Sequence, residues 1–304
     1  MHTPSASVIA GCGYTGTRLA VRLRAAGPTL AFNGSAQGTA EAIACGIDAH
    51  TMNLDATPVV STPSVEVFLD ALVDAGTASL VIYYLVPPAR DGEGDSRLER
   101  FLALLEGTHA HSLRIVYVSS TGVYGNTDGA AVDEKTPVQP LSARAKRRVA
   151  AEQILRTWCA SRTTELVIAR VPGIYGPKRL PIERILRGTP LICHEEASIG
   201  NRIHVDDLVS ALLLLGSSPH AAGQIFNVTD GNSISSTVYF EMVADILGLP
   251  KPPLRSRAEV QAAVSTETWS FMAEARQVSS VRIQRELGFS PQYKDLQLGI
   301  RASI

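Results

Sequence analysis

The sequence has few cysteines, and their spacing is not that of a metal site or a disulfide scaffold. The four cysteines are Cys12, Cys45, Cys159 and Cys193, and none of them belongs to a CxxC motif. Structural zinc sites and disulfide-rich domains need closely spaced or paired cysteines. We therefore expect a reduced cytoplasmic protein without a metal centre.

Excess charge and long apolar segments are also missing. The net charge is −1 over 304 residues, so bulk charge gives no reason to expect a nucleic-acid or membrane partner. The longest apolar runs, Leu80–Val86 and Ala211–Leu215, are far shorter than the ~20 residues that span a bilayer. The start of the chain, MHTPSAS, has neither a basic nor a long apolar part, so we expect no signal peptide. A hydrophobic content of 45% is enough for a sizeable core, which indicates a globular protein.

What the sequence does contain is a regular alternation of apolar strands and helical segments up to Val171. The expected strands are Ser7–Ala10, Thr29–Asn33, His50–Leu54, Ser79–Val86, Arg114–Ser119 and Glu165–Val171. The expected helices are Thr17–Ala26, Thr39–Cys45, Thr62–Gly76, Asp95–Glu106 and Ala143–Ala160. Alternation of this kind is typical of βαβ units, and it predicts an α/β fold with an open, doubly wound parallel sheet.

A glycine turn follows the first expected strand and opens the first helix. Gly11-x-Gly13-x-x-Gly16 in this position is the pattern of a dinucleotide site. Gly11 allows the tight turn, Gly13 lets the backbone approach a pyrophosphate, and Gly16 lets helix and strand pack closely. The helix N-terminus offers free N–H groups to the phosphates. The alternative is a glycine-rich turn without a ligand.

The end of the second strand, which usually selects between NAD and NADP, carries neither usual signal. Asn33, Gly34 and Ser35 provide no carboxylate for the ribose of NAD and no arginine for the 2′-phosphate of NADP. The missing carboxylate favours NADP slightly, because nothing there would repel a phosphate. Asn33 and Ser35 could hydrogen-bond to either sugar.

The rhythm of strands and helices breaks after Val171. A helix over Asp206–Leu215, a strand over Gln224–Val228 and helices over Ser236–Leu247 and Val278–Leu287 are expected there, with Asp206 as an N-cap. We expect residues 1–171 to form the dinucleotide-binding domain, with residues 203–230 returning to its sheet. Residues 172–202 and 231–304 would form a smaller C-terminal domain.

Five motifs in a fixed order resemble a known family. They are GCGYTG (11–16), VSSTGVYG (118–125), AAEQIL (150–155), RVPGIYGP (170–177) and RIHVDDLVSA (202–211). Over nearly the whole chain they are similar to the extended short-chain dehydrogenase/reductases, and more narrowly to the NAD-dependent epimerase/dehydratase family. The resemblance implies a Rossmann domain, a C-terminal substrate domain, NAD or NADP as cofactor, and a small polar substrate such as a sugar nucleotide. Helices flanking such a sheet could also form a homodimer.

The catalytic positions of this family fall between Ser120 and Glu152. Counted back from the VYG of the second motif, Ser120 stands at the family's Ser/Thr position, with Thr121 as the alternative. Counted back from Glu152, the YxxxK pair of the family is replaced by Arg144 and Arg148. A guanidinium stays protonated, so it cannot be the acid/base that a tyrosine would be. Arg148 could still bind ribose hydroxyls or a phosphate, and Arg144 could neutralise an anionic substrate.

Other readings of this helix remain open. A shifted register would pair Ser142 with Lys146, which keeps a lysine but offers a poor acid. The cations could also form a solvated helix face, as we expect for Lys146 and Arg147. Tyr124 and Tyr175 follow strand ends and could move a proton, although such residues more often pack in the core.

The resemblance also implies further contacts with the cofactor. They are Tyr14 and Thr15 at the pyrophosphate, Asn53 and Leu54 near the adenine, Leu85, Val86 and Pro87 along the cofactor channel, and Ser119, Arg148, Pro172 and Ile174 toward the nicotinamide. Two functions follow. One is an NAD(P)-dependent enzyme with an altered acid/base, and the other is an NAD(P)-binding sensor or regulatory protein without redox turnover.

Overall fold

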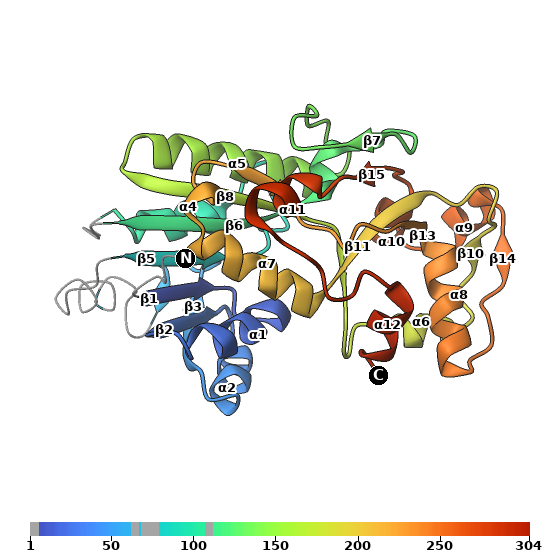
Figure 1. Ribbon diagram of the computed structural model, residues 1–304, viewed down its shortest axis with the longest axis horizontal. Helices are drawn as coiled ribbons and strands as arrows, with labels where there is room; N and C mark the ends of the chain where they lie inside the picture. Colours follow the sequence, from blue (N-terminus) through green and yellow to red (C-terminus); the bar gives the residue numbers. More distant parts are fainter. Residues whose placement is uncertain (1–5, 62–66, 68–78, 107–111) are drawn as a thin grey trace. The chain divides into compact units, whose positions relative to one another are not determined.

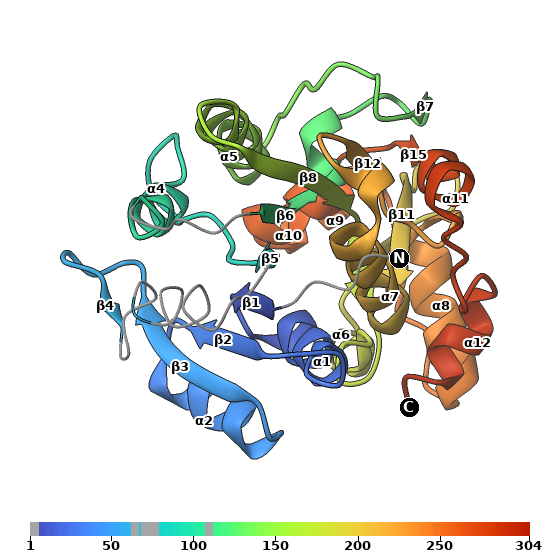
Figure 2. The ribbon, with the colours of Figure 1, turned by 60° about the vertical axis from the view of Figure 1, so that its left-hand side comes forward.

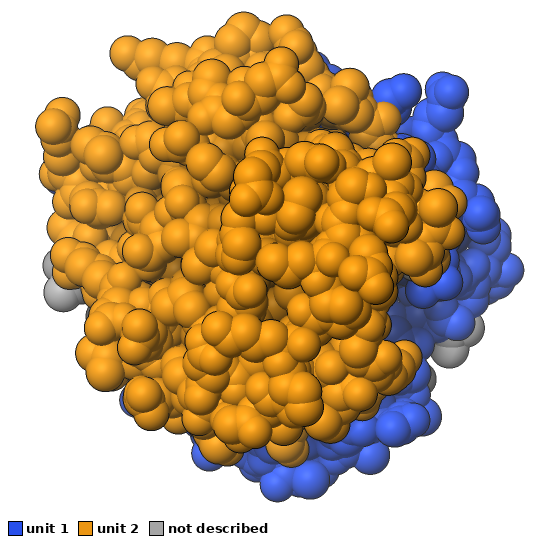
Figure 3. Space-filling view, turned by 90° about the vertical axis from the view of Figure 1, so that its right-hand side faces the viewer, with its two compact units in different colours: residues 1–120, 143–170, 209–226 blue, residues 121–142, 171–208, 227–304 orange. Residues whose placement is uncertain are grey.

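The computed structural model describes residues 6–61, 67, 79–106 and 112–304, and the chain divides into two compact units (Figures 1 and 3). Unit 1 consists of Met1–Ser120, Ala143–Arg170 and Val209–Phe226, and unit 2 of Thr121–Ser142, Val171–Leu208 and Asn227–Ile304. The helix expected over Thr62–Gly76 lies outside the described residues.

Unit 1 is organised around an eight-stranded sheet with the order β12-β8-β6-β5-β1-β2-β3-β4 (Figure 1). The strands are β1 (Ala6–Ala10), β2 (Thr29–Asn33), β3 (Asp48–Asn53), β4 (Val60–Ser61), β5 (Leu80–Tyr84), β6 (Leu113–Ser120), β8 (Thr164–Val171) and β12 (Ile225–Asn227). The pairings β3·β2, β2·β1, β1·β5 and β5·β6 are parallel, and β4 is antiparallel to β3. The strand order reverses between β1 and β5, which is the topological switch point of a doubly wound sheet. The predicted fold class is confirmed.

The helices of unit 1 cover both faces of this sheet (Figure 2). They are α1 (Tyr14–Leu23), α2 (Ala36–Ala44), α4 (Ser96–Ala103), α5 (Ala143–Ala160) and the later part of α7 (Val205–Ser217). Side chains of successive strand residues point to opposite faces. Tyr84 accordingly packs 5.1 Å from Phe101 of α4, centroid to centroid, whereas the Tyr83 hydroxyl lies against Gly216 of α7. Strands buried on both faces are therefore apolar throughout, as the sequence of β5 shows.

Unit 2 consists of small sheets and short helices. Its strands are β7 (Ala131–Val132), β9 (Gly173–Tyr175), β10 (Leu191–Ile192), β11 (Ile199–His204), β13 (Ser233–Ser235), β14 (Leu254–Arg255) and β15 (Gln277–Val278). Its helices are the 3₁₀ turn η1 (Thr121–Tyr124), α6 (Ile182–Leu186), α8 (Ser236–Leu247), α9 (Arg257–Ala263), α10 (Thr266–Met272), α11 (Val281–Leu287) and α12 (Leu296–Arg301). The strands form the sheets β13-β11-β9, β10-β14 and β15-β7. A short 3₁₀ turn, η2 (Pro219–Ala221), belongs to unit 1.

The structure differs from the expectations in several details. Residues 121–142, expected in the first domain, cluster with unit 2, because β7 pairs with β15 and the Thr127 N–H donates to the Ala275 carbonyl at 3.0 Å. The helix expected from Asp206 begins at Val205, so Asp206 lies in its first turn and is not the N-cap. A further helix, α12, follows the last one expected, and Asp295 caps it by accepting the N–H of Gln297 at 2.9 Å.

Candidate functional site

The glycine turn lies at the carboxyl end of β1, at the switch point of the sheet. Gly11 has φ +91°, and a Cβ there would lie 2.9 Å from the Val86 backbone nitrogen. A Cβ on Gly16 would lie 2.5 Å from the Gly11 carbonyl oxygen. A Cβ on Gly13 would meet nothing within 4 Å. The fold itself therefore requires Gly11 and Gly16, whereas Gly13 leaves open space at the start of α1.

The N-terminus of α1 has no cap of its own. Gly13 is the N-cap residue and has no side chain to accept a hydrogen bond, and the first turn contains no acidic residue. Thr15 is buried, and Tyr14 stacks under the Arg18 guanidinium, 4.2 Å from the ring centroid. The N–H groups of Thr15 and Gly16 and the partial positive charge of the helix are thus available to an anion at Gly13.

The polar side chains after β2 are engaged in starting α2. The Asn33 side chain donates to the Gly38 carbonyl at 2.9 Å, and the Ser35 hydroxyl accepts the Gly38 N–H at 3.2 Å. Both residues lie at the strand end where a dinucleotide's adenosine ribose binds in sheets of this kind. The structure adds no charged side chain at Asn33 or Ser35 that would select NAD or NADP.

The side chains of Asn53, the last residue of β3, and of Leu54, which follows it, are both engaged within the protein. The Asn53 carboxamide oxygen accepts the Asp55 N–H at 2.9 Å, and the Leu54 side chain is buried in the core. The Leu54 carbonyl accepts a hydrogen bond from Arg100 of α4 at 2.6 Å. The backbone of Leu54 and the partly exposed Asn53 remain to border a ligand here.

The backbone after β5 forms the wall beside the glycine turn. The Leu85 N–H donates to the Ala10 carbonyl at 2.8 Å, and the Val86 backbone lies against Gly11. The carbonyl oxygens of Val86 and Pro87 accept hydrogen bonds from Arg148 and Arg97, at 3.5 and 3.1 Å. Two arginines on two helices, α5 and α4, therefore fix this segment.

Arg148 lies at the carboxyl ends of β5 and β6. Its Nη1 donates to the Tyr117 hydroxyl at 3.0 Å and to the Val118 carbonyl at 2.9 Å, besides the contact with Val86. Burial raises the pKa of Tyr117, so this phenol stays neutral. Within the described residues, Nη2 and Nε of Arg148 have no hydrogen-bond partner, and the side chain makes no ion pair. Arg148 thus keeps a full charge and three N–H donors for another group.

The other predicted catalytic residues lie on α5, at the end of β6 and at the start of η1. Arg144 lies one turn earlier on α5 and is half-buried, whereas Lys146 is exposed. Ser120 ends β6 and is half-buried. Thr121 begins η1 in unit 2 and is buried. The structure therefore brings the glycine turn, the β5 end and Arg148 together within unit 1.

Two predicted contacts belong to unit 2. Ile174 of β9 pairs with Ile203 of β11, and both Pro172 and Ile174 are half-buried. Tyr124, a candidate for proton transfer, donates its hydroxyl to the Asn227 side chain at 2.8 Å in a buried site.

A buried ion pair behind the site was missed by the reasoning from sequence. Glu152 of α5 accepts hydrogen bonds from Arg170 of β8 at 2.7 and 3.1 Å and from the Ser119 hydroxyl at 2.7 Å. All three side chains are buried. The triad ties α5 to β6 and β8, and it commits the Ser119 hydroxyl to Glu152. Its signal was present, since Glu152 and Arg170 both lie within the family motifs.

Two buried polar groups near Arg148 were also missed. The Tyr84 hydroxyl and Asp95 Oδ2 are buried and have no hydrogen-bond partner in the described structure. The other Asp95 oxygen caps α4 by accepting the Leu98 N–H at 3.2 Å. Burial raises the pKa of both groups, and the Arg148 charge opposes this for both.

Unit 2 holds a second buried polar cluster, around Asp230. Asp230 Oδ2 and the Tyr175 hydroxyl are buried and lack hydrogen-bond partners in the described structure. Arg202 of β11 stacks 4.3 Å from the ring centroid of Tyr239 and donates to the Ile234 carbonyl at 3.3 Å. Burial is the main cause that raises the pKa of Asp230 to about 6.

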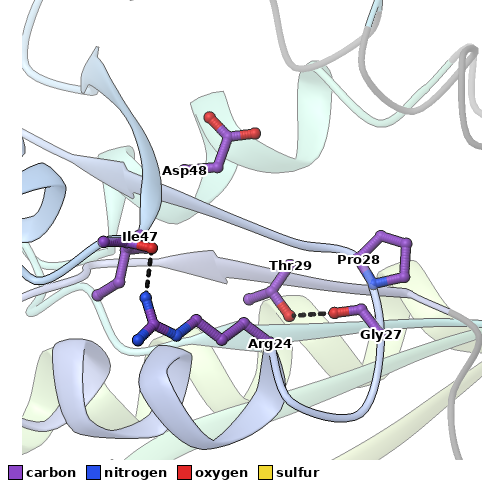
Figure 4. A pocket seen from close by; sticks show the side chains of 7 residues that line it. Arg24, Gly27, Pro28, Thr29, Ile47 and Asp48 are labelled. Atoms are coloured by element: carbon purple, nitrogen blue, oxygen red, sulfur yellow. Dashed lines mark hydrogen bonds between the residues drawn. The ribbon is translucent and has the colours of Figure 1, made fainter.

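A hollow of about 390 Å³ lies at the amino ends of the strands, where β2 and β3 begin (Figure 4). Arg24 crosses it and donates to the carbonyls of Cys45 and Gly46, which closes the C-terminus of α2. The Thr29 hydroxyl donates to the Gly27 carbonyl at 3.1 Å. The glycine turn lies at the carboxyl end of β1, whereas this hollow lies where the parallel strands β2 and β3 begin. The hollow is therefore separate from the candidate site.

Among the described residues, no group of three or more His, Cys, Asp and Glu side chains could hold a metal ion. None of the helices in that part of the chain is both long and apolar enough to cross a bilayer.

Comparisons with known proteins agree with this geometry. The model of the NAD dependent epimerase/dehydratase family matches residues 7–229. Protein YeeZ of Escherichia coli K12 is 31% identical over 291 residues, covering 94% of this chain and 96% of its own. UDP-glucose 4-epimerase of Corynebacterium glutamicum is 25% identical over 315 residues, covering 95% and 92%.

Solved structures have the same fold. A conserved protein of unknown function from Silicibacter pomeroyi superposes with a TM-score of 0.81 at 28% identity, over 98% of this chain and 97% of that one. MoeE5 in complex with UDP-glucose and NAD superposes with a TM-score of 0.70 at 20% identity, over the same shares. With the family match over residues 7–229, these findings establish that the chain belongs to the NAD-dependent epimerase/dehydratase family of extended short-chain dehydrogenase/reductases.

Proposed function

We propose that the protein is an NAD(P)-dependent enzyme of the epimerase/dehydratase type that acts on a small polar substrate, with a sugar nucleotide as the leading class. The observation that carries this proposal is the glycine turn at the switch point. Gly11 and Gly16 are needed by the fold, whereas Gly13 leaves a space that the protein does not fill, in front of an uncapped helix N-terminus. A pyrophosphate fits this combination of open space and free N–H donors.

The residues around the turn fit the rest of a nicotinamide dinucleotide. When bound, such a cofactor supplies hydride transfer. In the proposed arrangement, the first-turn N–H groups of α1 bind the pyrophosphate, with Tyr14 and Thr15 beside it. The Val86 backbone lines the channel, and the unused donors of Arg148 bind a ribose hydroxyl. Ser120 or Thr121 would hydrogen-bond to the reacting oxygen of the substrate, and Arg144 would neutralise an anionic substrate.

The choice between NAD and NADP leans slightly to NADP. No carboxylate follows β2 to repel a 2′-phosphate, and the side chains of Asn33 and Ser35 are uncharged. We further propose a cytoplasmic location, since all four cysteines are free thiols. Nucleic acids and membranes are not among the proposed partners, and a homodimer could form through helices that flank the sheet.

The pair Arg144 and Arg148 favours a second candidate function. A guanidinium cannot exchange a proton at working pH, so neither residue replaces the usual tyrosine as acid/base. A protein that keeps the cofactor site without this proton transfer would serve as an NAD(P)-binding sensor or regulatory protein.

Calorimetric titration with NAD⁺, NADH, NADP⁺ and NADPH tests the shared part of both proposals. Binding of at least one dinucleotide is expected, and Arg148→Ala should weaken it while the circular dichroism spectrum is unchanged. If none of the four binds, both proposals are wrong. A panel of sugar nucleotides, aldehydes and ketones then separates them: a change in the redox state of the bound cofactor supports the enzyme, and no change with any compound supports the sensor.

A further inference from the structure

We propose that Arg148 of α5 makes the site bind the reduced nicotinamide dinucleotide more tightly than the oxidised one. The inference rests on the proposed function, because it assumes that a nicotinamide dinucleotide occupies the switch point. It goes beyond that function by naming the redox state in which the protein holds the cofactor.

The position of Arg148 places it beside the nicotinamide half of such a cofactor. In a doubly wound sheet the pyrophosphate lies over the turn after β1, and the adenosine half extends over the end of β2. The other half must then extend over the ends of β5 and β6. Arg148 contacts the carbonyl of Val86, two residues after β5, and that of Val118, near the end of β6, and Val86 itself borders Gly11.

The two redox states of the cofactor differ in charge at this end. The oxidised nicotinamide ring carries one positive charge, and the reduced ring is neutral. A guanidinium is charged in both cases, so it repels only the oxidised ring. Within the described parts of the chain, Arg148 donates to neutral groups, a phenol and two carbonyls, and these do not cancel its charge.

Of the carboxylates of Glu152, Asp55 and Asp95, two are paired with other arginines. Glu152 pairs with Arg170 at 2.7 Å, and Asp55 pairs with Arg97 at 2.6 Å. Asp95 is the exception. Its carboxyl group is buried, interacts electrostatically with Arg148, and has one oxygen without a partner. When ionised it offsets part of the Arg148 charge, so its removal should strengthen the preference.

The expected size of the preference follows from Coulomb's law. For a guanidinium ~8 Å from the ring at an effective dielectric of ~20 to 40, the oxidised form should bind roughly ten-fold more weakly per charge. Salt weakens the effect, because the site is partly open to solvent.

The test is the ratio of the dissociation constants for NAD⁺ and NADH, and for the phosphorylated pair, measured by calorimetry on the purified full chain. We expect a ratio of about ten or more in favour of the reduced form. Arg148→Gln should lower it several-fold, whereas Arg148→Lys should keep it. Lys146→Gln is the matched control, since it removes the same charge from an exposed position of the same helix. Asp95→Asn should raise the ratio and retain the cap of α4, since asparagine also caps helices.

The outcomes separate this inference from the proposed function. Equal affinities for the oxidised and reduced forms would overturn the inference and leave the proposed function standing. A preference that persists unchanged in Arg148→Gln would overturn the assignment to this arginine. If neither form binds, the proposed function fails, and the inference fails with it. Circular dichroism spectra of each variant establish that it is folded.

Discussion

Substitution of Gly13 by aspartate should abolish tight cofactor binding without harming the fold. A side chain at this position meets no protein atom within 4 Å. The backbone at Gly13, with φ −89° and ψ −145°, lies outside the regular β region, so a residue other than glycine carries a small strain there. Aspartate is a better N-cap than glycine, which offsets this strain, so the free energy of unfolding should change by less than ~1 kcal/mol. A carboxylate ~5 Å from a doubly charged pyrophosphate costs about 3 kcal/mol at an effective dielectric of ~40. The dissociation constant should therefore rise by roughly a hundred-fold or more.

The assay combines calorimetric titration of the cofactor with urea unfolding of the same variant. Gly13→Asn is the matched control, because it has nearly the same shape without the charge and should lose less affinity. Gly16→Ala should instead lower the stability of the fold, since its Cβ would lie 2.5 Å from the Gly11 carbonyl oxygen. Overpacking of this kind costs ~1–3 kcal/mol of stability. If Gly13→Asp binds the cofactor as tightly as the unaltered protein, the pyrophosphate does not lie at this turn.

Three further predictions concern the buried charges. Glu152→Ala leaves Arg170 without its partner and should lower the free energy of unfolding by ~3–5 kcal/mol in urea, whereas a double change of the pair to Leu and Met should cost much less; equal losses would contradict this. Arg114→Met removes hydrogen bonds to three carbonyls at the end of α7, at 2.7–3.1 Å, and should cost roughly 3 kcal/mol, and a loss below ~1 kcal/mol would refute the role. The folded pKa of Asp230, about 6, is above its ordinary value of 3.8, so its contribution to stability is complete below pH 3.8 and is lost as the pH rises to about 6. Stability of the unaltered protein relative to Asp230→Asn should therefore fall by roughly 3 kcal/mol across this window, and parallel pH profiles of the two proteins would contradict the shift.

Local patterns predicted the elements that local forces determine. The helix Ser236–Leu247 was predicted at its observed bounds, because Ser235 caps one end and Gly248, with φ +64°, closes the other. The strand Thr29–Asn33 was likewise predicted at its observed bounds. Two-residue strands such as β7 and β15 carry no such pattern. They exist only because segments far apart in the sequence meet, and the sequence alone does not show that meeting.

The candidate site also has one part that could be predicted from the sequence and another that could not. The glycine turn could be predicted, since the spacing of Gly11, Gly13 and Gly16 is itself the structural requirement. For Arg148, the sequence predicted its position on a helix but not its contacts. Its contacts with the ends of β5 and β6, and the unpaired oxygen of Asp95, depend on packing between distant segments. The placement of Thr121, Pro172 and Ile174 near a nicotinamide remains a prediction.

A crystal structure of the protein with a bound nicotinamide dinucleotide tests the central claim most directly. The account predicts the pyrophosphate at the N-terminus of α1, beside Gly13, and a ribose hydroxyl within hydrogen-bond distance of Nη2 or Nε of Arg148. A dinucleotide bound elsewhere, or one whose ribose makes no contact with Arg148, would contradict it.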